Sequence, residues 1–330
     1  MPILELHSIH KSFRRGFWGV RTPILKGVDL AIERGDIYGF LGHNGAGKST
    51  TMKIILGLLR PEQGHTVIFG EAKSSEKSRA RMGYLGEEVG LYPNLNAMDT
   101  LLLAGELFRL PRKIARARAE ALIEQVGLAH AADRKTKQYS KGMRQRLGLA
   151  TALINDPELL ILDEPYSGLD PIGRRQLREL LLALKAQGKT IMMSSHIVPD
   201  VEAVCDKVGI LADGVIARAL DLNASRAQNS GEVEVVIAGA EARDMVARDF
   251  GEHQLHANDS ICIVRSSTDH RLKALVDHVY AANGRVVEVK PLRSGLEDVF
   301  VDVVGTRNGN GKKHTASNTS VMLEPELSRR

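Results

Sequence analysis

The stretch Gly42-His43-Asn44-Gly45-Ala46-Gly47-Lys48-Ser49-Thr50 fits the pattern G-x-x-x-x-G-K-[ST]. The apolar run Ile37–Leu41 precedes it and the helical run Met52–Leu59 follows it. Strand, glycine-rich loop and helix in this order favour phosphate binding, because glycines let backbone N–H groups approach an anion and the helix N-terminus adds a favourable dipole. The stretch therefore predicts a polyphosphate site at the end of a strand.

Within this loop, we expect Lys48 to reach the β- and γ-phosphates of a nucleotide and the Ser49 hydroxyl to ligate Mg²⁺. The alternative is a glycine-rich turn with a surface lysine, which leaves the flanking strand and helix unexplained. All nine residues are candidate nucleotide contacts: Gly42, His43, Asn44, Gly45, Ala46, Gly47, Lys48, Ser49 and Thr50.

A second motif follows the apolar run Leu159–Leu162, which is typical of a strand buried on both faces of a parallel sheet. Asp163 and Glu164 come directly after it. At the carboxyl edge of the sheet Asp163 can hold Mg²⁺, and Glu164 is a candidate base for the attacking water. Acidic strand ends are common, so this interpretation depends on the glycine-rich loop.

Within residues 1–222, strand-like and helical patterns alternate before about residue 94 and again after about residue 154. The stretch between them, from about 94 to 154, has helical spacing throughout. The predicted fold class is α/β, a P-loop NTPase core with an all-helical insertion, followed by a small α/β C-terminal domain. The expected divisions are a nucleotide-binding domain over 1–222, a linker over 223–230, the small domain over 231–304 and a disordered tail over 305–330.

Composition and simple sequence features narrow the compartment, the membrane relationship and the partners that we expect for this chain. The chain has 330 residues, a net charge of +5 and two cysteines without metal-type spacing, which favours a reducing cytosol. The first residues lack the features of a secretory signal, and no apolar run approaches the roughly 20 residues that span a bilayer. Because no basic face is interleaved with aromatic residues, we expect no nucleic-acid partner.

Further motifs make the chain resemble the ATP-binding-cassette (ABC) family over about residues 1–222. The signature segment Tyr139-Ser140-Lys141-Gly142-Met143 stands where that family has L-S-G-G-Q. The D-loop, Ser167-Gly168-Leu169-Asp170, and the switch histidine, His196, follow in the family's order. The resemblance implies ATP and Mg²⁺ as ligands, with Glu164, His196 and Lys48 as catalytic residues.

The resemblance also implies a homodimer. Ser140 and Gly142 lie at the start of a helix, and in this family that helix faces the γ-phosphate bound by the other subunit. Asp170 of the D-loop is a further candidate contact. Phe13 matches the residue that stacks on adenine, while Phe17 and Trp18 are alternatives for that role.

Two motifs depart from the family pattern. Lys141 and Met143 replace a glycine and the glutamine of the signature. In the Q-loop, Glu87 follows Gly83-Tyr84-Leu85-Gly86, where the family usually has glutamine. Glu87 can ligate Mg²⁺, but its charge also repels the γ-phosphate. We therefore expect hydrolysis at a slow rate.

The segment 296–300 resembles the closing segment of cassettes from ABC-2-type exporters. It implies the ATPase subunit of an exporter, peripheral on the inner face of the cell membrane, that drives a separately encoded integral membrane permease. The first alternative is a soluble ABC ATPase that acts on ribosomes or nucleic acid, and the second is a cassette that binds ATP without hydrolysis. The sequence does not identify the transported substrate.

Overall fold

The computed structural model describes residues 1–15, 19–72, 75–227, 232–239, 241, 245, 248, 254–257, 261–267, 270–291 and 296–305. Phe17 and Trp18, the linker residues 228–230 and the predicted tail over 306–330 lie outside the described residues. Gly305, the first residue assigned to that tail, ends a helix.

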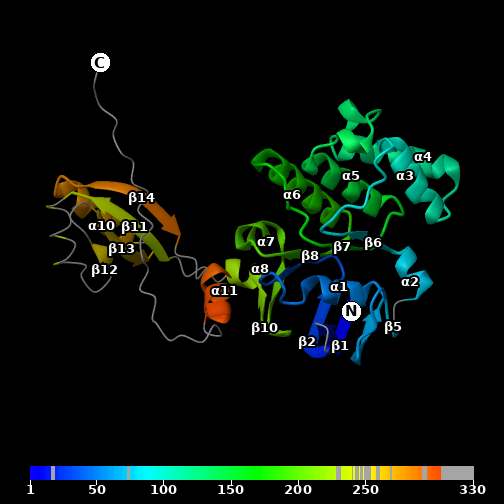
Figure 1. Cartoon of the computed structure of the whole chain (residues 1–330). Helices are drawn as coiled ribbons and strands as arrows, with labels where there is room; N and C mark the ends of the chain where they lie inside the picture. Colours follow the sequence, from blue (N-terminus) through cyan, green and yellow to red (C-terminus); the bar gives the residue numbers. More distant parts are fainter. Residues whose placement is uncertain are drawn as a thin grey trace, which may run out of the picture.

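A six-stranded sheet in the order β10-β9-β3-β8-β7-β6 forms the centre of the chain (Figure 1). Its five strands from β9 to β6 are parallel, and β10 pairs antiparallel with β9. Every residue of β3, β7 and β8 is buried, which confirms the expectation of strands covered on both faces. The bounds are β3 (Ile37–Leu41), β6 (Met82–Leu85), β7 (Leu159–Leu162), β8 (Thr190–Ser195), β9 (Lys207–Ala212) and β10 (Val215–Asp221).

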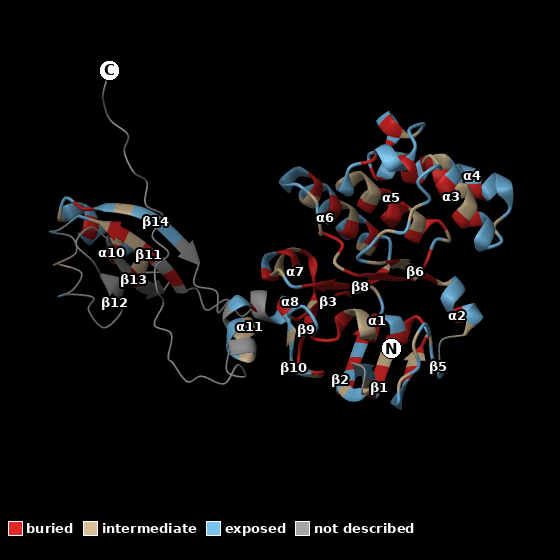
Figure 2. Cartoon of the chain, viewed as in Figure 1, coloured by how far each residue is buried: buried red, intermediate tan, exposed pale blue. Residues whose placement is uncertain are grey.

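One face of this sheet packs on α1 (Lys48–Ile55) and on a four-stranded antiparallel sheet. That second sheet has the order β2-β1-β4-β5, with β1 (Pro2–Arg15), β2 (Val20–Glu33), β4 (Gln63–Ile68) and β5 (Glu71–Ala72). Leu159 and Ile161 of β7 point into this layer, while Leu160 and Leu162 point to the opposite face. Successive side chains of β7 therefore point to opposite faces of the sheet, with the two-residue period of a strand, and β8 of the same sheet is coloured as buried in Figure 2.

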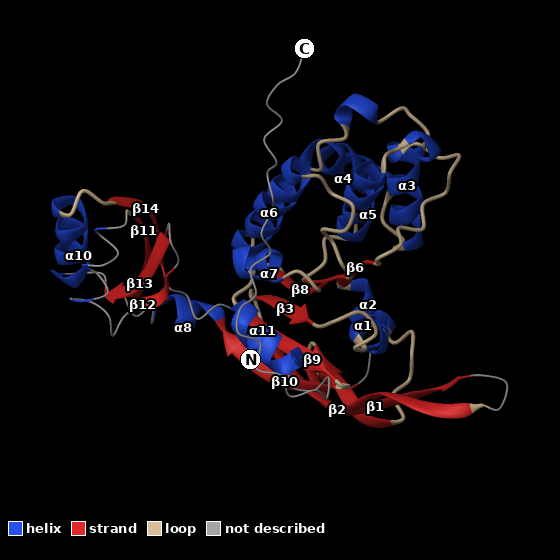
Figure 3. Ribbon diagram, turned by 60° about the vertical axis from the view of Figure 1, so that its left-hand side comes forward, coloured by secondary structure: helices blue, strands red, loops and turns tan. Residues whose placement is uncertain are grey.

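Helices cover the opposite face of the central sheet (Figure 3). The helices that follow one another in the predicted insertion are α3 (Ala97–Leu107), α4 (Arg112–Gln125) and α5 (Lys141–Leu153), with short 3₁₀ turns η1 (Ala129–Ala131) and η2 (Thr136–Gln138). The other helices of this part are α2 (Glu76–Ala80), α6 (Pro171–Ala186), α7 (Val198–Val204) and α8 (Leu222–Ala227). No helix in the described part of the chain is both long enough and apolar enough to cross a bilayer.

Three elements differ in length from the patterns that indicate them in the sequence. The apolar sequence runs 3–6 and 28–32 cover only parts of β1 and β2, which are both 14 residues long. Ile9 and Leu25 are buried outside these runs, so an apolar run marks only part of a long strand. Helix α1 ends at Ile55, four residues before the predicted end, and Gly57 follows with φ +73°. A left-handed glycine just after a helix is a common way for it to stop.

The C-terminal sheet has the order β12-β13-β11-β14 and is antiparallel. Its strands are β11 (Glu232–Ala238), β12 (Gln254–Ala257), β13 (Ile261–Ser267) and β14 (Arg285–Pro291), and α10 (His270–Ala281) packs on it. Val233, Val235 and Ile237, at every second position of β11, are buried. The sequence prediction did not include β12, because four residues with one aliphatic side chain carry too little pattern.

Helix α11 (Leu296–Gly305) returns from this small domain to the nucleotide-binding domain. Leu296 is buried in the large core cluster, and Val299 and Phe300 pack against the same cluster. The Leu296 N–H donates to Glu202 Oε1 of α7 at 3.0 Å. The predicted small domain, 231–304, thus includes a helix whose apolar side chains pack elsewhere; its boundaries stay a prediction.

Glu158, just before β7, is expected to stabilise the fold in a pH-dependent way. It accepts hydrogen bonds from Arg81 (2.6 and 2.9 Å) and from Arg34 (3.0 Å). The hydrogen bond from Arg81 is the main cause that lowers the Glu158 pKa from 4.5 to about 2. Since the folded pKa is the lower one, the stabilisation is present above about pH 4.5 and is lost as the pH falls towards 2.

The test is Glu158→Gln, with Glu179→Gln as a control that breaks an exposed i,i+4 pair with Arg175. Glu158 is 44% exposed, so solvent screens its ion pairs, and we expect a loss of about 0.5–1 kcal/mol in the free energy of unfolding near neutral pH. Urea titrations should show this difference shrinking below about pH 4, with little effect of the control. An equal loss of unfolding free energy near neutral pH and below about pH 4 would contradict the stabilising role assigned to the Glu158 carboxylate.

Candidate functional site

The glycine-rich loop connects the end of β3 to the start of α1. A Cβ on Gly47, which has φ +110°, would lie 2.6 Å from Leu25 Cδ2. A Cβ on Gly42 would lie 2.7 Å from the carbonyl oxygen of Leu211. The loop can adopt this path only with glycine at both places. No side chain caps the N-terminus of α1, so its first N–H groups remain available to an anion.

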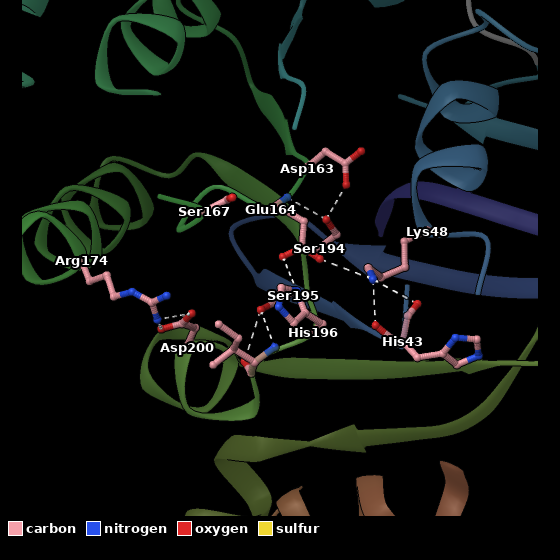
Figure 4. A network of polar contacts seen from close by, with 12 residues as sticks. His43, Lys48, Asp163, Glu164, Ser167, Arg174, Ser194, Ser195, His196 and Asp200 are labelled. Carbon is pink, nitrogen blue, oxygen red and sulfur yellow. Dashed lines mark hydrogen bonds and ion pairs between the residues drawn. The ribbon is translucent and has the colours of Figure 1, made fainter. Parts of the chain in front are cut away.

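Lys48 lies at the floor of the site and is only 6% exposed (Figure 4). Its Nζ donates hydrogen bonds to the carbonyl oxygens of Gly42 (2.7 Å) and His43 (3.3 Å). The same ammonium lies 3.4 Å from Glu164 Oε1. A buried lysine needs such partners because an isolated charge is costly to bury. The loop and the acidic motif therefore meet at this one cation.

Ser194, near the end of β8, fixes both acidic residues. Its hydroxyl donates to Asp163 Oδ1 at 2.6 Å, and its Oγ accepts the Glu164 N–H at 2.8 Å. Asp163 is 2% exposed, so this hydrogen bond holds a buried carboxylate in place. The sequence analysis did not assign Ser194 a role. The sequence feature that could have identified Ser194 is its position near the end of an apolar strand, two residues before the switch histidine.

Glu164 has a left-handed backbone with φ +49°. This conformation is uncommon for a residue with a Cβ and places the carboxylate between Lys48 and His196. Its Oε2 accepts a hydrogen bond from His196 Nδ1 at 2.9 Å, since an ionised carboxylate can only accept. The buried Oε1 lies 3.4 Å from Lys48 Nζ and has no hydrogen-bond partner among the described residues. His196 thus holds one carboxylate oxygen, and the other is without a hydrogen bond.

These groups line a pocket of about 520 Å³. It brings together most of the candidate residues from five separate parts of the sequence. Ile24 and Ser167 also line it, although the sequence analysis gave neither a nucleotide contact. The predicted residues in the lining are Phe13, Asn44, Gly45, Gly47, Lys48, Ser49, Thr50, Glu87, Asp163, Glu164 and His196.

Other candidates do not line this pocket in the described part of the chain. Gly42 and Ala46 are buried, with Ala46 packed into the core, and His43 is exposed. Ser140 and Asp170 act as helix caps: Ser140 Oγ accepts the Met143 N–H of α5 (3.2 Å), and Asp170 Oδ1 accepts the Gly173 N–H of α6 (2.8 Å). Gly142 lies in the first turn of α5. Within one chain, these three residues do not reach the site.

A second groove of about 600 Å³ adjoins the pocket and follows the Q-loop. Ser49, Glu87 and Asp163 belong to both linings. Burial, with smaller contributions from Asp163 and Glu87, raises the pKa of Tyr84 in this groove. On the other wall, a Cβ on Gly148 of α5 would lie 2.5 Å from a methyl group of Val89. The groove therefore connects the helical layer to the residues beside the phosphate site.

Comparisons with known proteins agree with this geometry. The family model described as "ABC transporter" matches residues 25–167. An uncharacterised ABC transporter ATP-binding protein of Synechocystis sp. is 38% identical over 91% of this chain and 84% of its own length. The bacitracin transport ATP-binding protein BcrA of Bacillus licheniformis is 35% identical over 84% of this chain and 91% of its own.

Among solved structures, the chain is similar to a dimeric ATP-binding cassette in a post-hydrolysis state bound to ADP and Pi. The TM-score is 0.61 and the identity 26%, over 66% of this chain and 98% of the other. The fold agrees with that of this solved structure. The chain therefore belongs to the ATP-binding proteins of ABC transporters and is an ATPase.

Proposed function

We propose that this chain is the motor subunit of an exporter, in which two copies close around two Mg-ATP and drive a separately encoded permease. One observation carries the proposal. The pocket of a single chain contains the phosphate loop and the acidic residues, whereas Ser140, Gly142 and Asp170 lie outside it at helix N-termini. A second copy related by two-fold symmetry supplies these residues across each nucleotide. The similarity to the bacitracin transport ATP-binding protein supports a transport role.

The residues of the pocket suit Mg-ATP. Lys48 and the N–H groups of the glycine-rich loop would hold the phosphates, and the Phe13 ring at the pocket wall would stack on adenine. Ser49, Asp163 and Glu87 offer the hard oxygen donors that Mg²⁺ prefers. The ion would neutralise charge on the phosphates during transfer.

Glu164 acts as the base in this proposal. His196 holds Oε2, and so Oε1 is left to orient the attacking water and accept its proton. Lys48 Nζ lies 3.4 Å from this same oxygen and partly neutralises it. An arriving phosphate attracts the ammonium and releases Oε1. Nucleotide binding and activation of the base are thereby coupled.

The Q-loop groove is the docking place for the permease in this proposal. It is lined by Tyr84, Leu91 and other residues of the segment 84–91, and it shares Ser49, Glu87 and Asp163 with the nucleotide pocket. A cytoplasmic helix seated there lies next to groups that respond to the γ-phosphate. The alternative, action on ribosomes or nucleic acid, predicts a different partner: co-purification with an integral membrane protein supports the proposal, and co-purification with ribosomes contradicts it.

The two-copy site is tested by sedimentation of a Glu164→Gln chain, whose slow turnover preserves bound ATP. We expect a dimer in Mg-ATP and a monomer in Mg-ADP. Adding Gly142→Asp places a negative charge opposite the phosphates of the facing copy, so the double variant should remain monomeric in Mg-ATP. In dilute solution, where both variants are monomers, the two should bind ATP within about 2-fold of each other. A Glu164→Gln chain that stays monomeric with ATP bound would contradict the proposal.

A further inference from the structure

Lys141, which stands where the ABC signature has a glycine, lies against the D-loop of its own chain. Its Nζ donates a hydrogen bond to Ser167 Oγ at 3.2 Å. Its methylene groups occupy the space beside Gly168, where an added Cβ would lie 2.8 Å from Lys141 Cγ, 2.6 Å from Cε and closer still to Cδ. Gly168 has φ +73°. A glycine at 141 could make neither contact, because it has no side chain.

Two neighbouring contacts extend this attachment. Gln145, one turn further along α5, is 3% exposed and donates from Nε2 to the carbonyl oxygen of Pro165 at 3.3 Å. A Cβ on Gly142 would lie 3.4 Å from Leu169 Cδ2. The first turns of α5 therefore follow the segment 165–169 along its length. Lys141 is the exposed member of this set, and Gln145 the buried one.

The segment 165–169 in turn connects to the catalytic carboxylate. The Ser167 N–H donates to the Glu164 carbonyl oxygen at 3.0 Å, and Ser167 and Glu164 both line the nucleotide pocket. Figure 4 places Ser167 close to Glu164. The contacts Lys141 to Ser167 and Ser167 to Glu164 thus link the N-terminus of α5 to the base in the same chain.

We propose that Lys141 is a positioning residue that fastens the signature segment to the segment 165–169, so that the α5 N-terminus and Glu164 move together. The attachment itself belongs to one chain. Its consequence rests on the proposed two-copy site: the nucleotide state of one pocket then sets the position of the signature segment that faces the other pocket. Family members with glycine at this position lack this side-chain link.

A competing role for Lys141 is direct contact with the phosphates of the facing copy. The two roles use different parts of the side chain. Contact with phosphate needs only the ammonium, whereas the attachment also uses the methylene stem over Gly168. Lys141→Met retains an apolar stem without the charge, and Lys141→Ala removes both. Because the hydrogen bond is solvent-exposed, we expect neither substitution to change the free energy of unfolding appreciably.

The attachment is measured first by amide hydrogen exchange in the nucleotide-free full chain, where no dimer is needed. Lys141→Ala should raise exchange in both 139–145 and 165–170, and Lys141→Met should raise it less. Lys113→Ala, at an exposed lysine of α4, is the control and should leave both segments unchanged. Gly168→Ala should displace the Lys141 stem, so it should raise exchange in 139–145 more in the Lys141 chain than in the Lys141→Ala chain.

Kinetics then separate positioning from binding. We expect Lys141→Ala to lower kcat by about 3- to 10-fold while ATP affinity, measured on dilute Glu164→Gln chains, changes by less than about 2-fold. Lys141→Met should retain most of the activity, and Lys113→Ala all of it. A fall in kcat matched by an equal loss of affinity in the dilute chain would overturn the positioning role.

Two further results would overturn the proposal. The first is unchanged exchange in Lys141→Ala, since no attachment would then exist. The second is a Lys141→Met chain as slow as Lys141→Ala but with normal exchange in 165–170, which would assign the lysine to phosphate contact. Altered exchange in a protein that forms no ATP-dependent dimer would support the attachment and contradict the two-copy site. The two ideas therefore fail on different measurements.

Discussion

Replacing Glu164 by glutamine is expected to lower kcat for ATP hydrolysis by about 10²- to 10³-fold while ATP affinity stays within a few fold of the original. An amide cannot take the proton of the attacking water. Its oxygen can still accept the His196 Nδ1–H bond, so the side chain remains in place. Removing the negative charge 3.4 Å from Lys48 also frees that ammonium for phosphate. Binding and turnover should therefore separate.

The measurement pairs steady-state phosphate release with equilibrium ATP binding. Glu179→Gln, at an exposed glutamate of α6, is the control and should match the unsubstituted chain in both assays. Normal turnover in Glu164→Gln would refute the assignment of the base. A parallel loss of ATP affinity would instead indicate that Glu164 mainly holds Lys48 and the phosphate loop.

The second large effect is expected from Gly47→Ala, which should lower ATP affinity by at least about 10²-fold. The substitution forces a side chain into φ +110° and places its Cβ 2.6 Å from Leu25 Cδ2 and 3.3 Å from Ile24 Cγ2. Leu25 is buried, so it cannot move aside freely. The loop must then shift away from the start of α1, and the N–H groups that bind phosphate shift with it.

Gly35→Ala provides the matched control, because Gly35 has φ +80° but nothing within 4 Å of the added Cβ. It should cost about 1 kcal/mol of unfolding free energy from backbone strain alone and leave ATP binding unchanged. Binding titrations and thermal unfolding of both variants make the comparison. Equal effects of the two substitutions on ATP affinity would mean that backbone strain, and not the collision with Leu25, lowers the affinity of Gly47→Ala.

The sequence predicted best those elements whose pattern has a single structural meaning. Ile37–Leu41 and Leu159–Leu162 became β3 and β7 with the predicted bounds, because a short apolar run next to a phosphate loop or an acidic pair is a strand buried on both faces. Helix α11 has apolar residues that need a partner, but its sequence does not say which surface provides one. Its packing on α7 and β9 depends on tertiary structure.

The residues of the candidate site also fall into those that a sequence pattern predicts and those that only the structure identifies. Residues inside motifs were found by pattern, whereas Ser194 acquires its role from strand register. Leu162 of β7 pairs with Met193 of β8, which brings Ser194 beside Asp163. Registers between strands distant in sequence cannot be read from either strand alone. Likewise, the sequence marks Lys141 only as a replacement for a signature glycine, and the structure places its stem over Gly168.

The position of α11 has a consequence for how the protein can be shortened. A chain truncated after the linker loses Leu296, Val299 and Phe300 together with the small domain. It thereby uncovers the apolar surface that they cover on the nucleotide-binding domain. Aggregation or non-specific binding of such a fragment would then result from this exposed apolar surface and not from the loss of the small domain. An internal deletion of 232–291 that keeps α11 separates the effect of losing the small domain from the effect of exposing this surface.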